Sequence, residues 1–267
     1  MIPNNAYWGN MYFFINRKGK IMEKVTSRDI AMMIDLSLLN PTFTTQEVID
    51  GCNLAKEFNV VSVCVRPCDV ELAKSILDGT DTLVTTVIGF PHGDHLTETK
   101  VYETLKAIEQ GCVEVDVVQN IGWTLSGQYD LVEADLKAVV DAAHAKGAKV
   151  KVIFENAYLN DEQKIKLCEI CTRVGADFTK TATGYAPSGA TVHDLKLMRA
   201  NTPERMQVKA AGGVRTLDAA LIVKAVGGSR FGCTRTRTIM EEAIKREKEG
   251  TLVLPEITED TKFETEK

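Results

Sequence analysis

The chain has 267 residues, of which 44% are hydrophobic, and it carries 32 Lys and Arg against 37 Asp and Glu for a formal net charge of −5. This length and hydrophobicity are ample for a substantial core. The acidic balance argues against nucleic acid or an anionic membrane as a partner, and no apolar stretch of the sequence approaches the roughly 18 residues that span a bilayer. The composition therefore excludes a membrane protein, a disordered chain and a disulfide-stapled module.

The seven cysteines are odd in number and scattered along the chain. This usage favours reduced thiols in the cytoplasm over a disulfide framework. Cys168 and Cys171 form a C-x-x-C pair, but they lie in a helical pattern over 161–174, where Ile165 would share their stripe. A zinc site needs four ligands, and no second Cys or His pair stands nearby in the sequence. We therefore predict that these thiols are buried in the core and do not bind zinc.

The two ends of the chain differ in composition from the part between them. Residues 1–24 include the apolar run 8–15, which is short, follows no basic stretch and precedes no small-residue cleavage site. Such a run makes a poor signal peptide, so we expect 1–24 to be an irregular leader. Residues 251–267 are polar and acidic, and we expect them to form a tail that frays from Pro255 onward.

Residues 25–250 repeat one unit, in which a short β-branched run precedes a helical stretch. The eight runs predicted to be strands are Met33–Leu36, Val60–Val65, Leu83–Gly89, Val113–Val118, Val150–Glu155, Asp177–Thr181, Gln207–Ala211 and Ser229–Cys233. The predicted helices include Thr44–Phe58, Glu98–Gln110, Leu131–Lys146, Glu162–Val174, Leu217–Val226 and Thr236–Lys248. Strands that alternate with helices imply a parallel sheet.

Eight such units in about 230 residues fit a (β/α)₈ TIM barrel, whose usual size is about 250 residues. A doubly wound open sheet is the alternative, but the chain lacks a G-x-G-x-x-G after its first strand. We therefore predict a single-domain α/β barrel over 25–250. Three glycines fall just past helical patterns, where a left-handed helix end is expected: Gly147, Gly175 and Gly227.

Charged side chains alternate with valines in several of the predicted strands. In 113–118 the valines share one face and Glu114 and Asp116 the other, and because helices cover the outside of a barrel, the carboxylates point inward. Buried charges must pair or shift their pKa values. The same parity predicts an interior that holds Asp35, Glu114, Asp116, Lys151, Glu155, Lys180 and Lys209.

These charges do not all suit the same role. Glu114 and Lys151 come early in their strands, where a structural salt bridge is expected. Asp116, Lys180 and Lys209 come late, at the end of the barrel where working residues gather. We therefore assign the last three to function.

Two neighbouring lysines indicate a specific chemistry. A lysine is a nucleophile only when neutral, and an unperturbed pKa near 10.4 leaves it charged. A second cation and partial desolvation lower that pKa, so the amine can attack a carbonyl and form a Schiff base. Asp116 would then move protons.

Glycine-bearing loops follow the last three strands and suggest a site for phosphate. Gly184 lies four residues after Lys180, Gly212 and Gly213 follow Lys209, and residues 232–235 read GCTR before a helix. Glycines let backbone N–H groups approach an anion, and these loops are a recurrent phosphate site of TIM barrels. We expect Thr234 and Arg235 to contribute to it.

Several motifs in register resemble those of the deoxyribose-phosphate aldolase family. They run in order from Asp35 to about Met240 and so cover most of the chain: DLSLLN (35–40), VCVRP (63–67), GFPHG (89–93), VDVVQNIG (115–122), KVIFE (151–155), ADFTKTATG (176–184) and VKAAGGVRT (208–216). The resemblance implies a class I aldolase on a TIM barrel, with no metal or other cofactor. Such a lyase reversibly cleaves 2-deoxyribose 5-phosphate to glyceraldehyde 3-phosphate and acetaldehyde.

Roles carry over by motif to four charged residues. Lys180 resembles the Schiff-base lysine, and Lys209 resembles the second lysine that lowers its pKa and shares in proton transfer. Asp116 resembles the proton-relay aspartate. Asp35 matches a position that lines the substrate site near the hydroxyls.

The resemblance also implies where phosphate binds and which partners the chain has. Gly184, Gly212 and Gly213 match the phosphate-binding loops. The implied partner is a phosphorylated sugar or aldehyde, with neither nucleic acid nor membrane, and the expected assembly is a homodimer. The implied setting is deoxyribonucleotide catabolism in the cytoplasm.

One stretch departs from the family and keeps alternatives open. Many members carry Gly-x-Ser-Ser where residues 232–235 read GCTR, so Arg235 replaces a small residue with a long cation. Arg235 could bind phosphate bidentately, recruit a different anion or close the pocket. A sister Schiff-base aldolase with another anionic carbonyl substrate is therefore an alternative. Two others are a non-catalytic barrel and a phosphosugar isomerase, which would leave both lysines unused.

Overall fold

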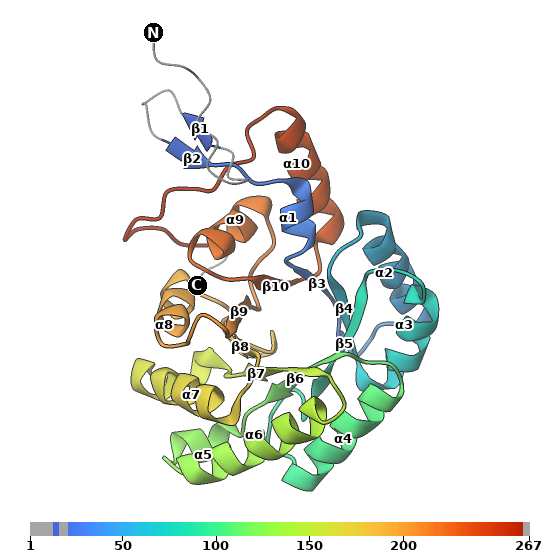
Figure 1. The fold of residues 1–267 in the computed structure, drawn as a ribbon, viewed down its shortest axis with the longest axis vertical. Helices are drawn as coiled ribbons and strands as arrows, with labels where there is room; N and C mark the ends of the chain where they lie inside the picture. Colours follow the sequence, from blue (N-terminus) through green and yellow to red (C-terminus); the bar gives the residue numbers. More distant parts are fainter. Residues whose placement is uncertain (1–12, 16–20, 264–267) are drawn as a thin grey trace.

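The computed structural model describes residues 13–15 and 21–263 (Figure 1). Most of the apolar run 8–15 lies outside the described residues. Within the expected leader, β1 (Phe13–Ile15) pairs antiparallel with β2 (Ile21–Glu23), and these form a small sheet separate from the main one.

Eight parallel strands close into a barrel, in the order β10-β3-β4-β5-β6-β7-β8-β9. This confirms the predicted (β/α)₈ fold. Figure 1 looks into the ring of strands, with the helices arranged around it. The strands lie within about two residues of their predicted ends: β3 (Ile34–Leu38), β4 (Ser62–Val65), β5 (Leu83–Ile88), β6 (Glu114–Val118), β7 (Lys149–Ile153), β8 (Phe178–Lys180), β9 (Gln207–Ala210) and β10 (Arg230–Cys233).

Helices follow the strands and form the outer layer. They are α1 (Ser27–Ala31), α2 (Thr45–Phe58), α3 (Val70–Leu77), α4 (Thr97–Glu109), α5 (Ile121–Leu125), α6 (Tyr129–His144), α7 (Asp161–Val174), α8 (Val192–Ala200), α9 (Leu217–Ala225) and α10 (Thr236–Lys248), with short 3-10 turns at Pro67–Asp69 and Asn156–Tyr158. The sequence analysis gave no bounds for α1, α3, α5 and α8. Each has fewer than ten residues, which is too short for a clear helical period.

The helix ends follow from local chemistry. The side chain of Thr44 caps α2 by accepting from the N–H of Glu47, whose carboxylate accepts from Thr44 in return. Asn160 and Gln163 do the same for α7, which ends at Gly175 with φ 82°. The three glycines predicted past helices all have positive φ, between 77° and 90°.

The barrel divides the buried residues by polarity, as the strand alternation predicts. Val115 and Val117 are buried in the apolar layer between strands and helices, whereas Asp116 between them is fully buried on the other face. Cys168 and Cys171 are buried in that apolar layer, as predicted, but Ile165 is only half-buried. All seven cysteines are free.

The C-terminal segment packs on the protein, in contrast to the expected frayed tail. The N–H of Val25 donates to Leu252 O at 3.2 Å, and that of Leu254 donates to Glu23 O at 3.0 Å. Leu252 and Phe263 are buried and anchor an otherwise polar segment, which runs back from α10 toward α9 (Figure 1). Beyond Pro255, where the composition predicts fraying, Phe263 is buried and Ile257 packs partly buried against the core.

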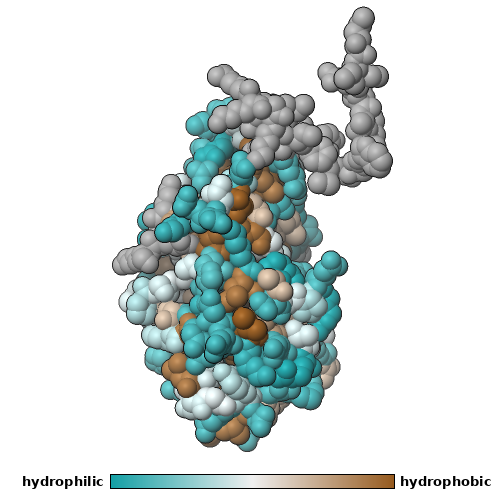
Figure 2. Space-filling view, turned by 90° about the vertical axis from the view of Figure 1, so that its left-hand side faces the viewer, coloured by the Kyte–Doolittle hydropathy of each residue, from teal (hydrophilic) through white to brown (hydrophobic). Residues whose placement is uncertain are grey.

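The outer surface is mainly polar on the side that Figure 2 shows, where apolar side chains form a narrow band. In the described part of the chain, no helix is both long and apolar enough to cross a membrane.

Candidate active site

Lys180 is the last residue of β8, so the strand ends with its side chain in the mouth of the barrel. Its Nζ donates to Oδ2 of Asp116 at 2.7 Å. Lys180 is 3% exposed and lines a cavity that opens among the loops after the strands. A buried amine beside an open cavity is the geometry that a lysine nucleophile needs.

Lys209 lies beside Lys180, because the two residues are partners in the parallel register of β8 and β9. Its Nζ donates to the same Oδ2 of Asp116 at 2.8 Å and lies 2.5 Å from Oδ2 of Asp35. The structure thus brings together Lys180, Lys209 and Asp116, the three residues that the sequence assigns to catalysis.

The pKa values of the two lysines shift in opposite directions. Burial lowers the pKa of Lys180, and the charge of Lys209 adds to this effect against the opposing pull of Asp116. Burial also disfavours the charge on Lys209, but Asp116 and Asp35 outweigh it and raise the pKa of Lys209. Lys180 is therefore the lysine that loses its proton more easily.

The lysines belong to a larger buried cluster held by ion pairs. Lys151 lies 2.5 Å from Glu114 and 3.0 Å from Asp116, so the salt bridge expected at the bottom of the barrel continues into the site. Arg230 reaches Asp35 at 2.6 Å and Glu114 at 3.1 Å.

The charges of this cluster do not balance when all its members are ionised. Its carboxylates are Asp35, Glu114 and Asp116, and its cations are Lys151, Lys180, Lys209 and Arg230. Deprotonation of Lys180 would leave three charges of each sign. Burial would raise the pKa of Asp116, but the lysines around it hold that pKa well below its usual range. The surrounding cations likewise lower the pKa of Asp35, so both aspartates stay ionised, and with every member charged the cluster has one cation in excess.

Arg230 is the member that the sequence prediction missed. It begins β10 and shares its parity with Gly232, at which an added Cβ would lie 3.3 Å from Ser37 Oγ and 3.9 Å from Lys209 Cε inside the barrel. The alternation of inward and outward residues along β10 could therefore have predicted that Arg230 points into the barrel. Glu155, predicted to point inward, is buried beyond the end of β7 and bonds to Thr183 outside the ion-pair cluster.

The cavity above Lys180 has a volume of 630 Å³ and is lined in part by four predicted phosphate-site residues: Gly184, Gly212, Gly213 and Thr234. The three glycines have φ of 92°, 78° and 94°, a region that side chains rarely adopt. Their backbone is thus free to approach a ligand closely.

Two predicted substrate residues do not line this cavity. Asp35 is fully buried in the ion-pair cluster, where it accepts from Ser62 at 2.7 Å and from Arg230. Arg235 is exposed and precedes α10, outside the lining. The arginine in the lining is instead Arg215, from the loop after β9.

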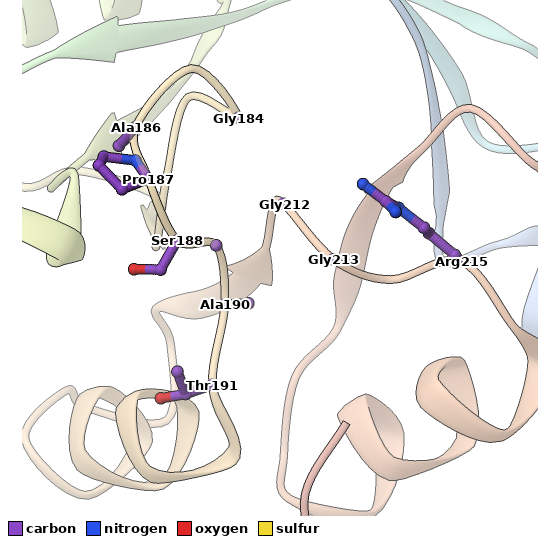
Figure 3. A pocket seen from close by; sticks show the side chains of 10 residues that line it. Gly184, Ala186, Pro187, Ser188, Ala190, Thr191, Gly212, Gly213 and Arg215 are labelled. Carbon is purple, nitrogen blue, oxygen red and sulfur yellow. The ribbon is translucent and has the colours of Figure 1, made fainter. Parts of the chain in front are cut away.

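Arg215 also borders a smaller hollow of 250 Å³ behind the glycines. Figure 3 shows its side chain extending from the loop after β9 toward the loop after β8, with Gly212 between them. Ser188 and Thr191 line the far side of this hollow. Arg215 is exposed and forms no ion pair within the described part of the chain, so its charge could meet an anion on the glycine side.

Comparisons with known proteins agree with this geometry. The family described as DeoC/LacD family aldolase matches residues 29–242. The chain belongs to this family. It is 49% identical over 218 residues to the deoxyribose-phosphate aldolase of Rhodopirellula baltica. The matched region covers 82% of this chain and 90% of the relative. The resemblance drawn from the motifs is thereby confirmed, and the chain is an aldolase of this family.

Solved structures support the same assignment. The putative deoxyribose-phosphate aldolase from Coccidioides immitis is 35% identical, with a TM-score of 0.79 over 82% of this chain and 87% of that chain. The deoxyribose phosphate aldolase from Aeropyrum pernix, described as a unique tetramer, is 28% identical, with a TM-score of 0.76 over 81% and 92%.

Proposed function

We propose that this chain reversibly cleaves 2-deoxyribose 5-phosphate to glyceraldehyde 3-phosphate and acetaldehyde through a Schiff base on Lys180. The observation that carries the proposal is the shared contact of Lys180 and Lys209 with Asp116, beside a cavity ringed by glycine loops. The names of the relatives support the substrate. A phosphosugar isomerase would not need this pair of lysines.

Imine formation is the first step. The neutral Nζ of Lys180 attacks C1 of the open-chain aldehyde, and the carbinolamine loses water to give a protonated imine. The lowered pKa of Lys180 and the excess cation in the cluster both favour the neutral amine that this step requires.

Cleavage of the carbon–carbon bond is the second step. A base takes the proton of the C3 hydroxyl, the C2–C3 bond breaks, and its electron pair moves into the iminium to leave an enamine. Glyceraldehyde 3-phosphate departs. The enamine then gains a proton at C2, and water hydrolyses the imine to release acetaldehyde and restore the amine. The iminium itself takes up the electrons, so the reaction needs no metal or other cofactor.

Asp116 and Lys209 would handle the protons. Asp116 contacts both amines and stays ionised, which suits a proton acceptor that works with a water at the carbinolamine and enamine stages. Lys209 keeps its charge, so it favours neutral Lys180 and can donate a proton.

The phosphate would bind at the other end of the cavity. Gly184, Gly212 and Gly213 offer backbone there, Thr234 offers a hydroxyl, and Arg215 supplies a cation. We further propose that the phosphorylated sugar is bound by a homodimer in the cytoplasm. The free cysteines agree with a reducing compartment, and light scattering tests the assembly.

Borohydride trapping tests the proposal directly. Acetaldehyde and borohydride should add an ethyl group of about 28 Da to Lys180, located by peptide mapping, because reduction makes the imine permanent. Lys180→Arg is the matched control, since it keeps a cation but provides no nucleophilic amine. Folded protein without an adduct on Lys180 would refute the Schiff-base mechanism. A panel of phosphorylated and other anionic aldehydes then distinguishes this substrate from that of a sister aldolase.

A further inference from the structure

Glu155, just beyond β7, has an unusual backbone conformation. It has φ 58° and ψ 61°, in the left-handed region that side chains rarely adopt and that costs free energy. Among the described residues the other non-glycine case is Asn59, at the end of α2, where asparagine is well tolerated. The surroundings of Glu155 therefore maintain this conformation, and the contacts of its carboxylate show which interactions the conformation makes possible.

Just past the last paired residues of β7 and β8, the backbone forms a bulge at Glu155. The N–H of Phe154 donates to Lys180 O, and the N–H of Asn156 donates to Thr181 O, both at 2.9 Å. Between these two hydrogen bonds the chain advances by two residues after β7, from Phe154 to Asn156, but by only one after β8, from Lys180 to Thr181. Glu155 is therefore the extra residue. Bulges often lie beside active sites, where they redirect a side chain.

The redirected carboxylate binds the loop that follows Lys180. It accepts the N–H of Thr183 at 3.2 and 3.3 Å on its two oxygens, and it also accepts the hydroxyl of Thr183. Both residues are buried. One side chain therefore satisfies both donors of Thr183 at the edge of the cavity.

These contacts continue across the mouth of the barrel. Thr183 Oγ1 accepts the N–H of Tyr185 at 3.0 Å, and the Tyr185 hydroxyl donates to Leu39 O, just beyond β3, at 2.9 Å. Thr183, Gly184, Tyr185 and Leu39 all line the cavity above Lys180. Glu155 is thus the buried anchor of a chain of hydrogen bonds that shapes one wall of the substrate site.

We propose that Glu155 is a positioning residue that sets the phosphate end of the site by acting through Thr183 on the loop 181–185. The inference rests on the proposed function. Lys180 itself is held by the strand ladder and by Asp116, so loss of the Glu155 contact should change the affinity for phosphorylated substrate more than the chemistry at the amine.

Glu155→Gly and Glu155→Gln test this role. Glycine adopts the left-handed conformation without cost but has no carboxylate, and glutamine keeps one acceptor oxygen. We expect Glu155→Gly to raise KM for 2-deoxyribose 5-phosphate about tenfold or more, because both donors of Thr183 lose a charged acceptor, with kcat changed less than about threefold. KM of Glu155→Gln should lie between those of the wild type and Glu155→Gly. KM for unphosphorylated 2-deoxyribose should stay within about twofold, because its binding does not use the phosphate end.

A double variant checks that the effect passes through Thr183. Thr183→Val removes the hydroxyl alone, so adding it to Glu155→Gly should cost less than the sum of the two single changes. An additive result would contradict the proposal. So would equal rises of KM for the two sugars, or an unchanged KM in a folded Glu155→Gln variant, which decides the question if Glu155→Gly fails to fold.

Borohydride trapping of acetaldehyde on wild-type Lys180 distinguishes failure of the proposed function from failure of the positioning role of Glu155. Absence of trapping in the wild type would refute the proposed function. Trapping in the wild type together with an unchanged KM in the Glu155 variants would refute only the positioning role.

Discussion

Lys180 and Lys209 are register partners on adjacent strands, and both donate to a single oxygen, Oδ2 of Asp116. The contact with Asp116 is common to both, yet their pKa values shift in opposite directions. The difference comes from Asp35, which lies 2.5 Å from Lys209 and favours its charged form. Asp35 is therefore important even though it does not line the cavity, because it determines which lysine keeps its proton.

Replacement of Lys209 tests the electrostatic part of this arrangement. Lys209→Leu removes a charge that lowers the pKa of Lys180, so that pKa should rise. Since imine formation needs neutral Lys180, the acidic limb of the rate profile should move up by about one pH unit. The pH dependence of borohydride trapping measures this shift. Lys209→Arg keeps the charge and should leave the limb near its original position, and an unmoved limb in Lys209→Leu would contradict the assignment.

Asp116→Asn should separate imine formation from proton transfer. Asp116 favours the charged form of Lys180, so its loss should let the imine form at lower pH. Turnover should nevertheless fall by about 10² to 10⁴, the usual contribution of a positioned acid or base. Single-turnover trapping and steady-state cleavage measure the two effects. Equal losses in both would mean that Asp116 serves only to hold the cluster together.

A second buried ion pair, outside the site, should stabilise the folded state. Lys100 on α4 is fully buried, and its Nζ donates to Asp135 on α6 at 2.7 Å and to Val118 O, at the end of β6, at 3.0 Å. Asp135→Asn should destabilise the fold by about 3–5 kcal/mol, because it leaves a buried ammonium unpaired. Urea unfolding gives this free energy. Lys100→Met with Asp135→Leu should recover most of it, and equal losses in the single and double variants would contradict the account.

The strand parity explains why so much of the site could be predicted from the sequence. A period of two in a barrel sends alternate residues inward, so Asp116, Lys180 and Lys209 could be placed on the inner face without coordinates. The same rule, applied to β10, would have placed Arg230 beside them.

The contacts that depend on irregular backbone were not predictable in this way. Parity assigns Glu155 to the barrel interior, but the bulge after β7 turns its carboxylate toward Thr183 instead. The position of Arg215 over the cavity, and of Arg235 outside it, depends on where loops turn and where α10 begins. Periodicity carries no information about either.

Replacing the two arginines near the glycine loops tests which of them binds the phosphate. Both side chains are exposed, but Arg215 lines the cavity and Arg235 does not. Arg215→Ala should raise KM for 2-deoxyribose 5-phosphate about tenfold or more, since it removes a charge-assisted contact to phosphate, and should leave kcat much less affected. Arg235→Ala should change KM by less than about threefold, because Arg235 does not line the cavity and is exposed to solvent. Initial rates across substrate concentration measure both, with 2-deoxyribose as the unphosphorylated control. A larger effect at Arg235 would mean that residues 232–235 close over the phosphate when substrate binds.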